Sequence, residues 1–409
     1  MRILMLAQFY APITGGEERH VQDLSIALAA RGHQVAVATL GHEGCADFEI
    51  DRGVRVYRIR GTLQRAAWLF KESGRRHVPP VPDPELTWAL RHVIACERPD
   101  IVHAHNWLVH SFLPLKRWSG AKLVVTLHDY SLLCAKKRLM VRGAPCDGPG
   151  IGKCLGCTRQ HYGLAKGSLT VVGNWVMGAV ERRAVDLFLC VSRATAAGNG
   201  LDHRCKTLQI IPNFVPDDIG LPRTDCESYA AQLPADGYLL FVGDLSREKG
   251  VDVLLAAYAG LTNAPPLVLI GRRLPDTPSL LAPNVVALDS WPHDAVMEAW
   301  RRSSMALVPS TWAEPFGIVA IEAMAYGRPV IASDIGGLRD IVVDGETGFR
   351  VVPGDPAALR QAIGRLLADP ELREWMGCAG QRKVAEFRAS AVVPRIEQAY
   401  RAVIGAGPE

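Results

Sequence analysis

Two glutamates stand eight positions apart where a strand pattern gives way to a helical one. Glu314 lies in the loop before the predicted helix, and Glu322 lies about a turn and a half inside it. Carboxylates accept charge-assisted hydrogen bonds, so they suit the hydroxyl groups of a sugar. The unpaired N–H groups of Gly317, Ile318 and Val319 open the helix and are suited to hold a diphosphate without a metal ion. The two carboxylates can therefore reach different parts of one phosphorylated ligand.

Two loops near predicted strand ends supply further groups for such a ligand. Lys249 lies in residues 243–250, which directly follow a strand pattern, and it is the natural cation for phosphate there. His128 comes directly after the strand pattern of residues 123–127. A neutral imidazole donates to a hydroxyl and an imidazolium stabilises a departing phosphate, although a lone histidine is more often structural.

Four of the ten cysteines gather in a glycine- and proline-rich insertion after His128, residues 134–161. Stable disulfides are disfavoured in a reducing compartment, whereas a tetrahedral thiolate set around Zn²⁺ would order such a segment. A structural zinc site is therefore one hypothesis, with His161 as a replacement ligand; an Fe–S cluster and free, redox-sensitive thiols are the alternatives. The four candidate ligands are Cys134, Cys146, Cys154 and Cys157.

Short β-branched runs alternate with helical patterns and must position these residues. Such alternation predicts parallel sheets with crossover helices, and 409 residues are too many for one core. The first helix is expected to bury Val21, Leu24 and Leu28 and to end at Gly32. The runs cover residues 3–6, 35–39, 54–59, 123–127 and 187–191 in the first half, and 238–242, 267–270, 285–288, 306–308 and 330–332 in the second.

The run from Pro309 to Val330 resembles the family 4 retaining glycosyltransferases of the GT-B fold, whose Glu-x7-Glu signature it matches at Glu314 and Glu322. The resemblance implies an α/β protein with two Rossmann-like domains that face each other across a cleft, the C-terminal helix returning to the N-terminal domain. It implies that Glu314 binds hydroxyls of a donor sugar and Glu322 the ribose of its nucleotide. Phe316 and the amides that follow it would bind the diphosphate.

The same resemblance gives the remaining residues their expected roles. Gly16, in the glycine-rich loop before the first helix, would lie near the donor phosphates, although a glycine pair also fits a tight turn alone. His128 matches the active-site histidine of the family, and His103 and His105 are candidates for acceptor contact. The chain departs from the pattern at Asp244, where the family usually has arginine. Arg247 or Arg272 would then have to supply the second positive charge.

The expected activity is metal-independent transfer of a glycosyl group, of hexosyltransferase type, from a UDP- or GDP-sugar to an acceptor hydroxyl. In the family, retention is generally attributed to front-face attack, with Glu314 and His128 as catalytic groups that position and stabilise. We expect no cofactor for catalysis, with structural zinc as the open question, and a role in bacterial glycoconjugate, polysaccharide or natural-product biosynthesis. The alternatives are a GT-B sugar phosphorylase, a nucleotide-sugar epimerase, or a non-catalytic nucleotide-sugar binding protein.

Domain limits follow from the patterns and the resemblance. Residues 1–218 are expected to form the acceptor-binding domain, 219–236 a linker, 237–389 the nucleotide-sugar-binding domain, and 390–409 the returning helix. The N-terminus does not have the pattern of a secretory signal, and no stretch has the length of a membrane span, so we expect a cytoplasmic protein without nucleic-acid partners.

A basic cluster in the first half fits either a solvated surface loop or binding to the inner face of an anionic membrane. The acceptor could be a glycan, a lipid-linked group or a small molecule. The basic cluster comprises Lys136, Lys137, Arg138, Arg142, Lys153, Arg159 and Lys166.

Overall fold

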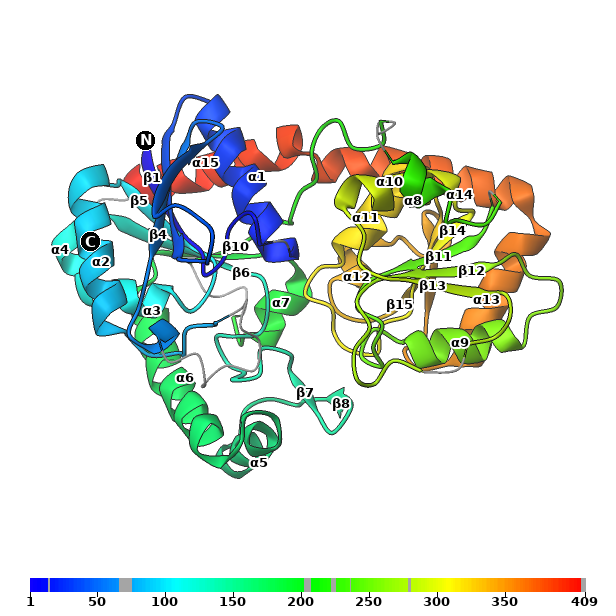
Figure 1. The fold of residues 1–409 in the computed structure, drawn as a ribbon, viewed down its shortest axis with the longest axis horizontal. Helices are drawn as coiled ribbons and strands as arrows, with labels where there is room; N and C mark the ends of the chain where they lie inside the picture. The colour runs from blue at the N-terminus through cyan, green and yellow to red at the C-terminus, as the bar shows by residue number, and fades with distance from the viewer. Residues whose placement is uncertain are drawn as a thin grey trace. The chain divides into compact units, whose positions relative to one another are not determined.

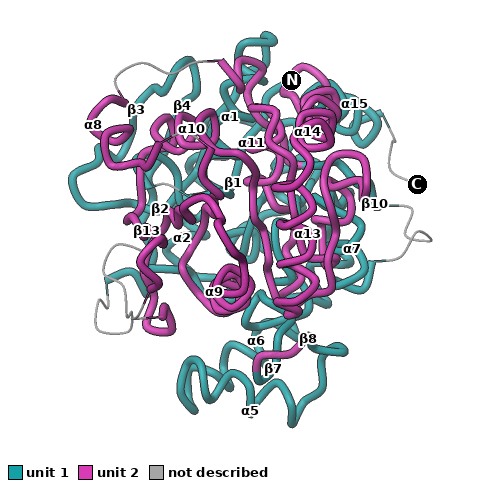
Figure 2. The backbone as a smooth tube through the Cα atoms, turned by 90° about the vertical axis from the view of Figure 1, so that its right-hand side faces the viewer, with its two compact units in different colours: residues 1–142, 146–212, 392–409 teal, residues 143–145, 213–391 magenta. Residues whose placement is uncertain are grey.

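The computed structural model describes residues 1–13, 15–65, 76–201, 207–221, 226–235, 237–278 and 281–405. The chain divides into two compact units, coloured in Figure 2. Unit 1 comprises residues 1–142, 146–212 and 392–409, and unit 2 comprises residues 143–145 and 213–391. No helix among the described residues is both long enough and apolar enough to cross a membrane.

Unit 1 is built on an eight-stranded sheet in the order β10-β9-β6-β5-β1-β2-β4-β3. All neighbours are parallel except β3 and β4. Every residue of β5 and of β9 is buried, as expected for strands covered on both faces. The strands are β1 (Arg2–Leu6), β2 (Gln34–Leu40), β3 (Phe48–Asp51), β4 (Val54–Ile59), β5 (Ile101–Ala104), β6 (Lys122–Leu127), β9 (Leu187–Cys190) and β10 (Leu208–Ile210).

The helices of unit 1 connect these strands (Figure 1). The first of them buries Val21, Leu24 and Leu28 as predicted, and Gly32 follows its end with a φ of 88°. The helices are α1 (Gly16–Ala30), α2 (Pro84–Glu97), α3 (Val109–Phe112), α4 (Lys116–Ser119), α5 (Ile151–Tyr162), α6 (Leu164–Ala184) and α7 (Arg193–Gly198), with 3₁₀ turns η1 (Leu63–Arg65) and η3 (Leu113–Leu115). The short strand β7 (Met140–Val141) also belongs to unit 1, whereas β8 (Ala144–Pro145) groups with unit 2.

Unit 2 is built on a six-stranded parallel sheet in the order β13-β12-β11-β14-β15-β16. Its strands are β11 (Leu239–Val242), β12 (Leu267–Ile270), β13 (Val285–Leu288), β14 (Met305–Val308), β15 (Val330–Ser333) and β16 (Gly348–Val351). Its helices are α8 (Glu227–Ala230), α9 (Val251–Ala259), α10 (His293–Arg302), α11 (Ile318–Ala325), α12 (Leu338–Ile341), α13 (Pro356–Ala368) and α14 (Pro370–Val384), with the 3₁₀ turn η4 (Ala385–Phe387).

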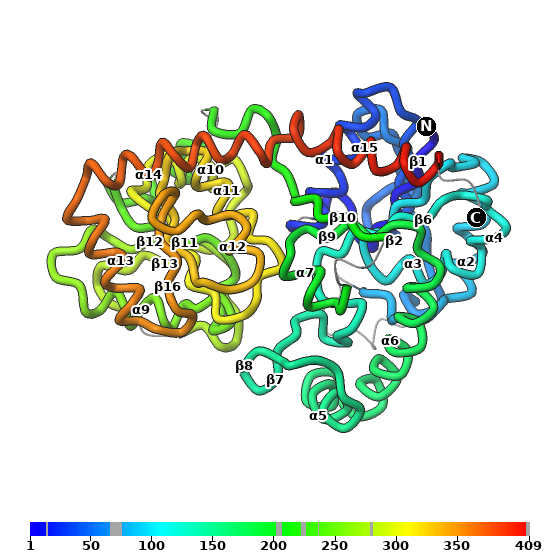
Figure 3. Tube along the Cα trace, turned by 180° about the vertical axis from the view of Figure 1, so that it is seen from behind, coloured from blue at the N-terminus to red at the C-terminus, as the bar shows by residue number. Residues whose placement is uncertain are grey.

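The last helix, α15 (Ala389–Gly405), belongs to unit 1 from Val392 onward. Glu397 on this helix pairs with Arg31 Nη2 at 2.6 Å and His33 Nε2 at 2.8 Å, just after α1. Tyr400 is fully buried and its hydroxyl lies 2.6 Å from His103 Nδ1 on β5. The α/β fold with two Rossmann-like sheets and a helix returning to the first of them is confirmed. The helix can be followed from behind in Figure 3.

Two parts of the chain differ from their sequence interpretation. The described part of the expected linker, residues 219–236, includes the short helix α8 and groups with unit 2, as do residues 213–218. The insertion at 134–161 is not all loop, because α5 carries Cys154 and Cys157, and α6 extends from its end for 21 residues. The prolines of the insertion all precede α5, but Gly152 and Gly156 lie inside it, so composition did not indicate this pair of helices.

Candidate functional site

Glu314 and Lys249, which lie 65 positions apart in the sequence, come together in unit 2. Lys249 Nζ lies 2.6 Å from Glu314 Oε1, and Ser310 Oγ donates to the same oxygen at 2.6 Å. Glu314 is only 6% exposed. Lys249 also lies 5.5 Å from the centre of the Trp312 ring, a cation–π distance. The carboxylate and the ammonium therefore form one charge-paired group, built from the loops that follow β11 and β14.

The chain turns from this pair into α11 at Gly317. Gly317 has a φ of 105°, and a Cβ atom there would lie 2.5 Å from Leu338 Cδ2. A side chain is therefore excluded both by the backbone conformation and by packing. Ile318 is the first residue of α11 and Val319 the second, so their N–H groups open the helix as predicted. Phe316 is buried, and its ring contacts that of Phe387.

Glu322 has a partner that the motif does not indicate. It lies inside α11 and is 4% exposed, and His293 Nε2 at the start of α10 lies 3.0 Å from its Oε1. His293 follows a proline at the N-terminal end of its helix. The only sequence signal for the pairing is that a histidine opens a helix shortly before the Glu314 segment. The structure thus places a second ionisable side chain at the position expected for ribose binding.

Asp244 is charge-paired in the structure. Arg272, just after β12, places Nη2 at 3.2 Å from Asp244 Oδ2 and Nε at 3.3 Å from Oδ1. The backbone N–H of Arg247 donates to Asp276 Oδ2 at 2.9 Å. The negative charge that departs from the family pattern is thus compensated by Arg272, whose guanidinium is about half exposed.

In unit 1, His128 lies in a cluster of histidines at the carboxyl ends of β5 and β6. His105 Nδ1 lies 3.0 Å from His128 Nε2, and their rings stack with centres 5.3 Å apart. The ring of His20, from α1, lies 5.0 Å from that of His128. Both ring nitrogens of His103 form hydrogen bonds inside the core, to Tyr400 and Thr126 at 2.6 Å each. Neither nitrogen is therefore left to contact a glycosyl acceptor.

Burial keeps this cluster neutral. It lowers the pKa of His128 to about 3, with a further contribution from His103. It also lowers the pKa of His103 to about 3, and it depresses the pKa values of His20 and His105 well below their ordinary range. Each ring is therefore an uncharged imidazole near neutral pH.

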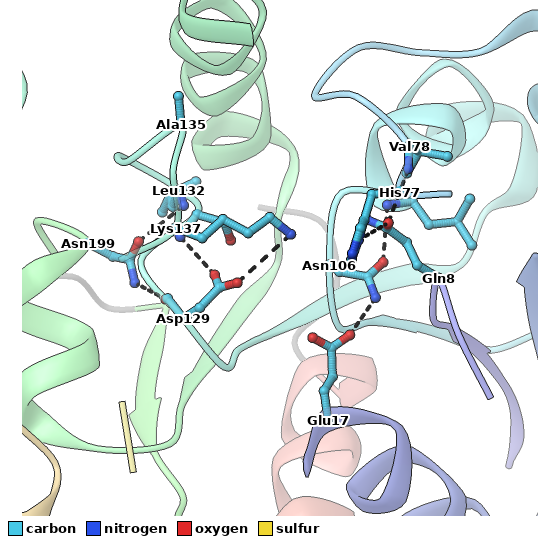
Figure 4. A network of polar contacts seen from close by, with 12 residues as sticks. Gln8, Glu17, His77, Val78, Asn106, Asp129, Leu132, Ala135, Lys137 and Asn199 are labelled. Atoms are coloured by element: carbon cyan, nitrogen blue, oxygen red, sulfur yellow. Dashed lines mark hydrogen bonds and ion pairs between the residues drawn. The ribbon is translucent and has the colours of Figure 1, made fainter. Parts of the chain in front are cut away.

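Glu17, beside the cluster in sequence, is the acid at the start of α1. Figure 4 shows its carboxylate pointing toward the amide of Asn106, which donates to Oε1. Burial, with the charge of Glu18, raises the pKa of Glu17 to about 8, although Lys137 opposes the shift. Glu17 is therefore a protonated carboxylic acid near neutral pH, and the sequence pattern gave no sign of it. The adjacent Gly16 is the exposed first residue of α1, with open space where a Cβ would be.

Two groups of residues bear on metal binding. Among the described residues, the ligand atoms of His20, His105 and His128 lie within 4.8 Å of one another. Two nitrogens on one tetrahedral zinc would lie about 3.4 Å apart. In the structure a hydrogen bond joins His105 Nδ1 to His128 Nε2.

Within the described residues, the four cysteines of the insertion do not form a group whose sulfur atoms all lie within 4.8 Å of one another. Cys154 Sγ accepts from Gly150 N, Cys146 Sγ contacts Gly148 O, and Cys157 Sγ contacts Met140 O. Burial raises the pKa of the Cys134 thiol. A zinc site at these cysteines remains a prediction, and it would require the thiolates to move together.

Comparison with known proteins gives consistent matches over both halves of the chain. Residues 14–219 match the family described as Glycosyltransferase Family 4, and residues 232–383 match Glycosyl transferases group 1. A glycogen synthase of Mycobacterium tuberculosis is 30% identical over 98% of this chain and 95% of its own. A D-inositol 3-phosphate glycosyltransferase of Acidothermus cellulolyticus is also 30% identical, over 74% of this chain and 67% of its own.

Solved structures share the fold at lower identity. Sucrose-phosphate synthase from Thermosynechococcus elongatus superposes with a TM-score of 0.76 at 24% identity, over 99% of both chains. The Anabaena protein HepE in complex with UDP has a TM-score of 0.70 at 18% identity, over 98% of this chain and 100% of its own. The catalytic domain of starch synthase IV from Arabidopsis thaliana, bound to ADP and acarbose, has a TM-score of 0.69 at 18% identity, over 98% and 99%.

Proposed function

Because the chain belongs to glycosyltransferase family 4, we propose that it transfers a glycosyl group from a nucleotide-sugar donor to an acceptor hydroxyl, with retention of configuration and without a catalytic metal ion. The observation that carries the proposal is the pair of Glu314 and Lys249, 2.6 Å apart at the loop that leads into α11. A buried carboxylate that accepts from sugar hydroxyls and a cation that binds phosphate then lie side by side.

The N-terminal end of α11 would hold the donor diphosphate. The N–H groups of Ile318 and Val319 and the positive end of the helix dipole favour an anion there. Lys249 would turn from Glu314 toward the departing phosphate, and the freed Glu314 oxygen would accept from a sugar hydroxyl. Glu322, held by His293, would accept from the ribose.

In unit 1, we assign His128 to the transferred sugar. An uncharged imidazole donates one hydrogen bond and can position a hydroxyl without adding charge. The rate acceleration would then come from positioning and from electrostatic stabilisation of the leaving phosphate, without a covalent intermediate. The proposed chemistry is front-face attack by the acceptor hydroxyl on the anomeric carbon, while the bond to the phosphate oxygen breaks and that oxygen accepts the hydroxyl proton.

The donor is proposed to be a UDP- or GDP-sugar, with ADP-sugars as the third class to test. UDP and ADP are the nucleotides bound in the structurally similar proteins HepE and starch synthase IV. The bacterial relatives named above support a place in bacterial polysaccharide, glycoconjugate or natural-product biosynthesis. We place this reaction in the cytoplasm. The positive charge of the basic cluster supports association with an anionic membrane.

The decisive experiment measures donor binding and donor hydrolysis by the full chain. A thermal-shift panel of UDP-, GDP- and ADP-sugars should single out one donor, because a ligand that binds the folded state raises the melting temperature. The preferred donor should be hydrolysed slowly without acceptor. Glu314→Ala should lower that rate at least about 100-fold, whereas Glu346→Ala, an exposed acid of the same unit, should leave it unchanged.

Other outcomes would point to the competing functions. Donor stabilisation without turnover would indicate a binding protein, sugar phosphate formed only with added phosphate would indicate a phosphorylase, and an altered nucleotide sugar would indicate an epimerase. With an acceptor in hand, nuclear magnetic resonance of the product reports the anomeric configuration. An inverted product would contradict the retaining mechanism.

The proposed roles of metals are tested separately. Donor hydrolysis should survive treatment with EDTA, because Lys249 and the α11 amides are proposed to neutralise the diphosphate. Elemental analysis of protein purified without chelator should find stoichiometric zinc if the cysteines form a structural site. A Cys154→Ser, Cys157→Ser double variant should then lose it. Absence of zinc from the unmodified protein would exclude that site.

A further inference from the structure

Helix α6 exposes large apolar side chains along its outer face, defined here as Leu169, Val172, Trp175, Val176 and Val180. These side chains are between 42% and 61% exposed, and four of them recur with the 3.6-residue period of a helix. Leu164 at the start of α6 and Ile151 at the start of α5 are exposed as well. A contiguous set of this kind marks an interaction surface.

The inner face of the same helix is mostly small or polar, with Val171 as its one large apolar residue. Its buried positions are Gly167, Thr170, Val171, Gly173, Asn174, Gly178 and Glu181. A surface helix of a globular protein normally points its apolar residues at the core and its polar residues at water. Apart from Val171, α6 does the reverse, so the apolar side chains of its outer face are not required by the core of unit 1.

Close contacts fix this orientation. A Cβ atom on Gly173 would lie 2.9 Å from Val81 Cγ1, and one on Gly178 would lie 2.8 Å from the backbone oxygen of Leu132. Glu181 Oε2 lies 3.0 Å from His110 Nε2, and both side chains are buried. Turning the helix to hide its outer face would break these contacts and bury larger side chains where only hydrogen fits.

Among charged side chains, the stretch that contains α5 and most of α6 carries only basic ones, and the acids that bracket it are paired, Asp147 with Lys153 and Glu181 with His110. From Gly148 to Val180 the chain contains no Asp or Glu, while Lys153, Arg159 and Lys166 fall in this stretch. Arg159 and Lys166 are exposed. In Figures 1 and 3, α5 and α6 form an arm at one end of unit 1. Cations beside an exposed apolar face complement anionic lipid headgroups over an acyl layer. A two-fold contact with a second copy would instead bring like charges together.

We propose that the outer face of α6 binds the surface of an anionic lipid bilayer, with Trp175 at the level of the headgroups and Val172 and Val176 in the acyl boundary. The inference deepens the proposed function, and in one respect rests on it, because a transferase held on a bilayer would take an acceptor that the bilayer carries.

Cosedimentation of the full chain with vesicles tests the proposal. The protein should sediment with phosphatidylcholine vesicles that contain phosphatidylglycerol and much less with phosphatidylcholine alone. A Val172→Ser, Val176→Ser variant should bind the mixed vesicles at least about tenfold more weakly, because two buried apolar side chains are lost. Its melting temperature and donor hydrolysis should match those of the unmodified protein, since both side chains are exposed.

A second readout locates the contact on α6. Brominated lipids in the mixed vesicles should quench tryptophan fluorescence, and Trp175→Phe should remove most of that quenching. Trp375→Phe is the matched control, because Trp375 is 50% exposed on α14 and Trp175 is 53% exposed. Quenching that persists in Trp175→Phe would overturn the assignment to this face.

The remaining outcomes separate this inference from the proposed function. Failure to bind mixed vesicles, with donor hydrolysis intact, would overturn the lipid surface alone. A lipid-independent dimer that the Val172→Ser, Val176→Ser variant abolishes would assign the face to a second copy and overturn it too. Vesicle binding without any donor hydrolysis would leave the surface standing and contradict the proposed function.

Discussion

Three carboxylates in the segments of the candidate site are buried or half-buried, and each pairs with a side chain that is distant in the sequence. Glu314 has Lys249, Glu322 has His293, and Glu17 has Asn106. The first two acids were predicted from their spacing and from the resemblance, whereas their partners lie 65 and 29 positions away. The roles assigned to these residues remain predictions for the donor experiments. Their pairing is a finding that no local pattern contains.

Glu17 offers a test at the scale of one residue. Its folded pKa of about 8 lies above the ordinary value of 4.5, because burial and Glu18 disfavour the charged form. Asp129 also disfavours it, while Lys137 and the Asn106 hydrogen bond favour it. A raised folded pKa contributes stability that is fully present below the unfolded pKa and is lost as the pH rises through the folded pKa.

We therefore expect Glu17→Gln to remove this loss. The melting temperature of the variant minus that of the unmodified protein should increase steadily between about pH 5 and about pH 8.5. The reason is that glutamine keeps the shape of the side chain and cannot ionise. Glu43→Gln is the control, because the Glu43 side chain is 94% exposed, and it should give a constant difference. Parallel pH profiles for Glu17→Gln and the unmodified protein would show that Glu17 is ionised in the folded state.

At the scale of elements, most strands were predictable because β-branched runs and flanking turns lie within a few residues of each other. The predicted runs at 54–59, 267–270 and 285–288 have the observed bounds. β3, β10 and β16 were missed because a charged or polar residue interrupts the apolar run of each, and β7 and β8 have only two residues each. α6 shows a different limit: its apolar period indicates a helix, but an amphipathic pattern alone would assign the wrong face to the core.

The N-terminal end of α11 depends on Gly317, whose φ of 105° other residues rarely adopt. Gly317→Ala should lower the free energy of unfolding by about 1–3 kcal/mol through backbone strain, more if Leu338 cannot shift. It should also reduce the thermal shift given by the preferred donor, because the first amides of α11 would be displaced.

Gly364→Ala provides the control for that substitution. Gly364 lies inside α13 with open space around its Cβ position, so alanine should stabilise the helix by about 0.5–1 kcal/mol and leave the donor shift unchanged. An unaltered donor shift in Gly317→Ala would mean that the diphosphate does not contact this helix end. Both quantities come from thermal and denaturant unfolding of the same samples.

At the scale of the whole molecule, α15 links the end of the chain to the start of unit 1. Burial would raise the pKa of Glu397, but hydrogen bonds from His33 and Arg31 outweigh it and hold that pKa below its ordinary value. A depressed carboxylate pKa contributes stability above the unfolded pKa of 4.5 that is lost as the pH falls through the folded pKa.

Glu397→Gln should therefore destabilise the protein by about 1–3 kcal/mol near neutral pH, because it leaves buried polar groups unpaired. The difference should shrink below about pH 4 as the carboxylate of the unmodified protein is protonated. Denaturant unfolding at several pH values measures it. Arg401→Gln, whose side chain is 70% exposed beside Glu397, should cost less than about 1 kcal/mol. Equal effects of the two changes would contradict a buried ion network.

The two α/β halves and the segment from Glu314 to Glu322 were predictable from local signals, namely strand runs, helix starts and a motif of nine residues. The pairing of Lys249 with Glu314 and the cluster of His20, His105 and His128 appear only in the folded chain. The same holds for the outward orientation of the apolar face of α6. The two side-chain groups join residues far apart in the chain, and the orientation of α6 depends on the segments that pack against it. No periodicity within one element encodes such contacts.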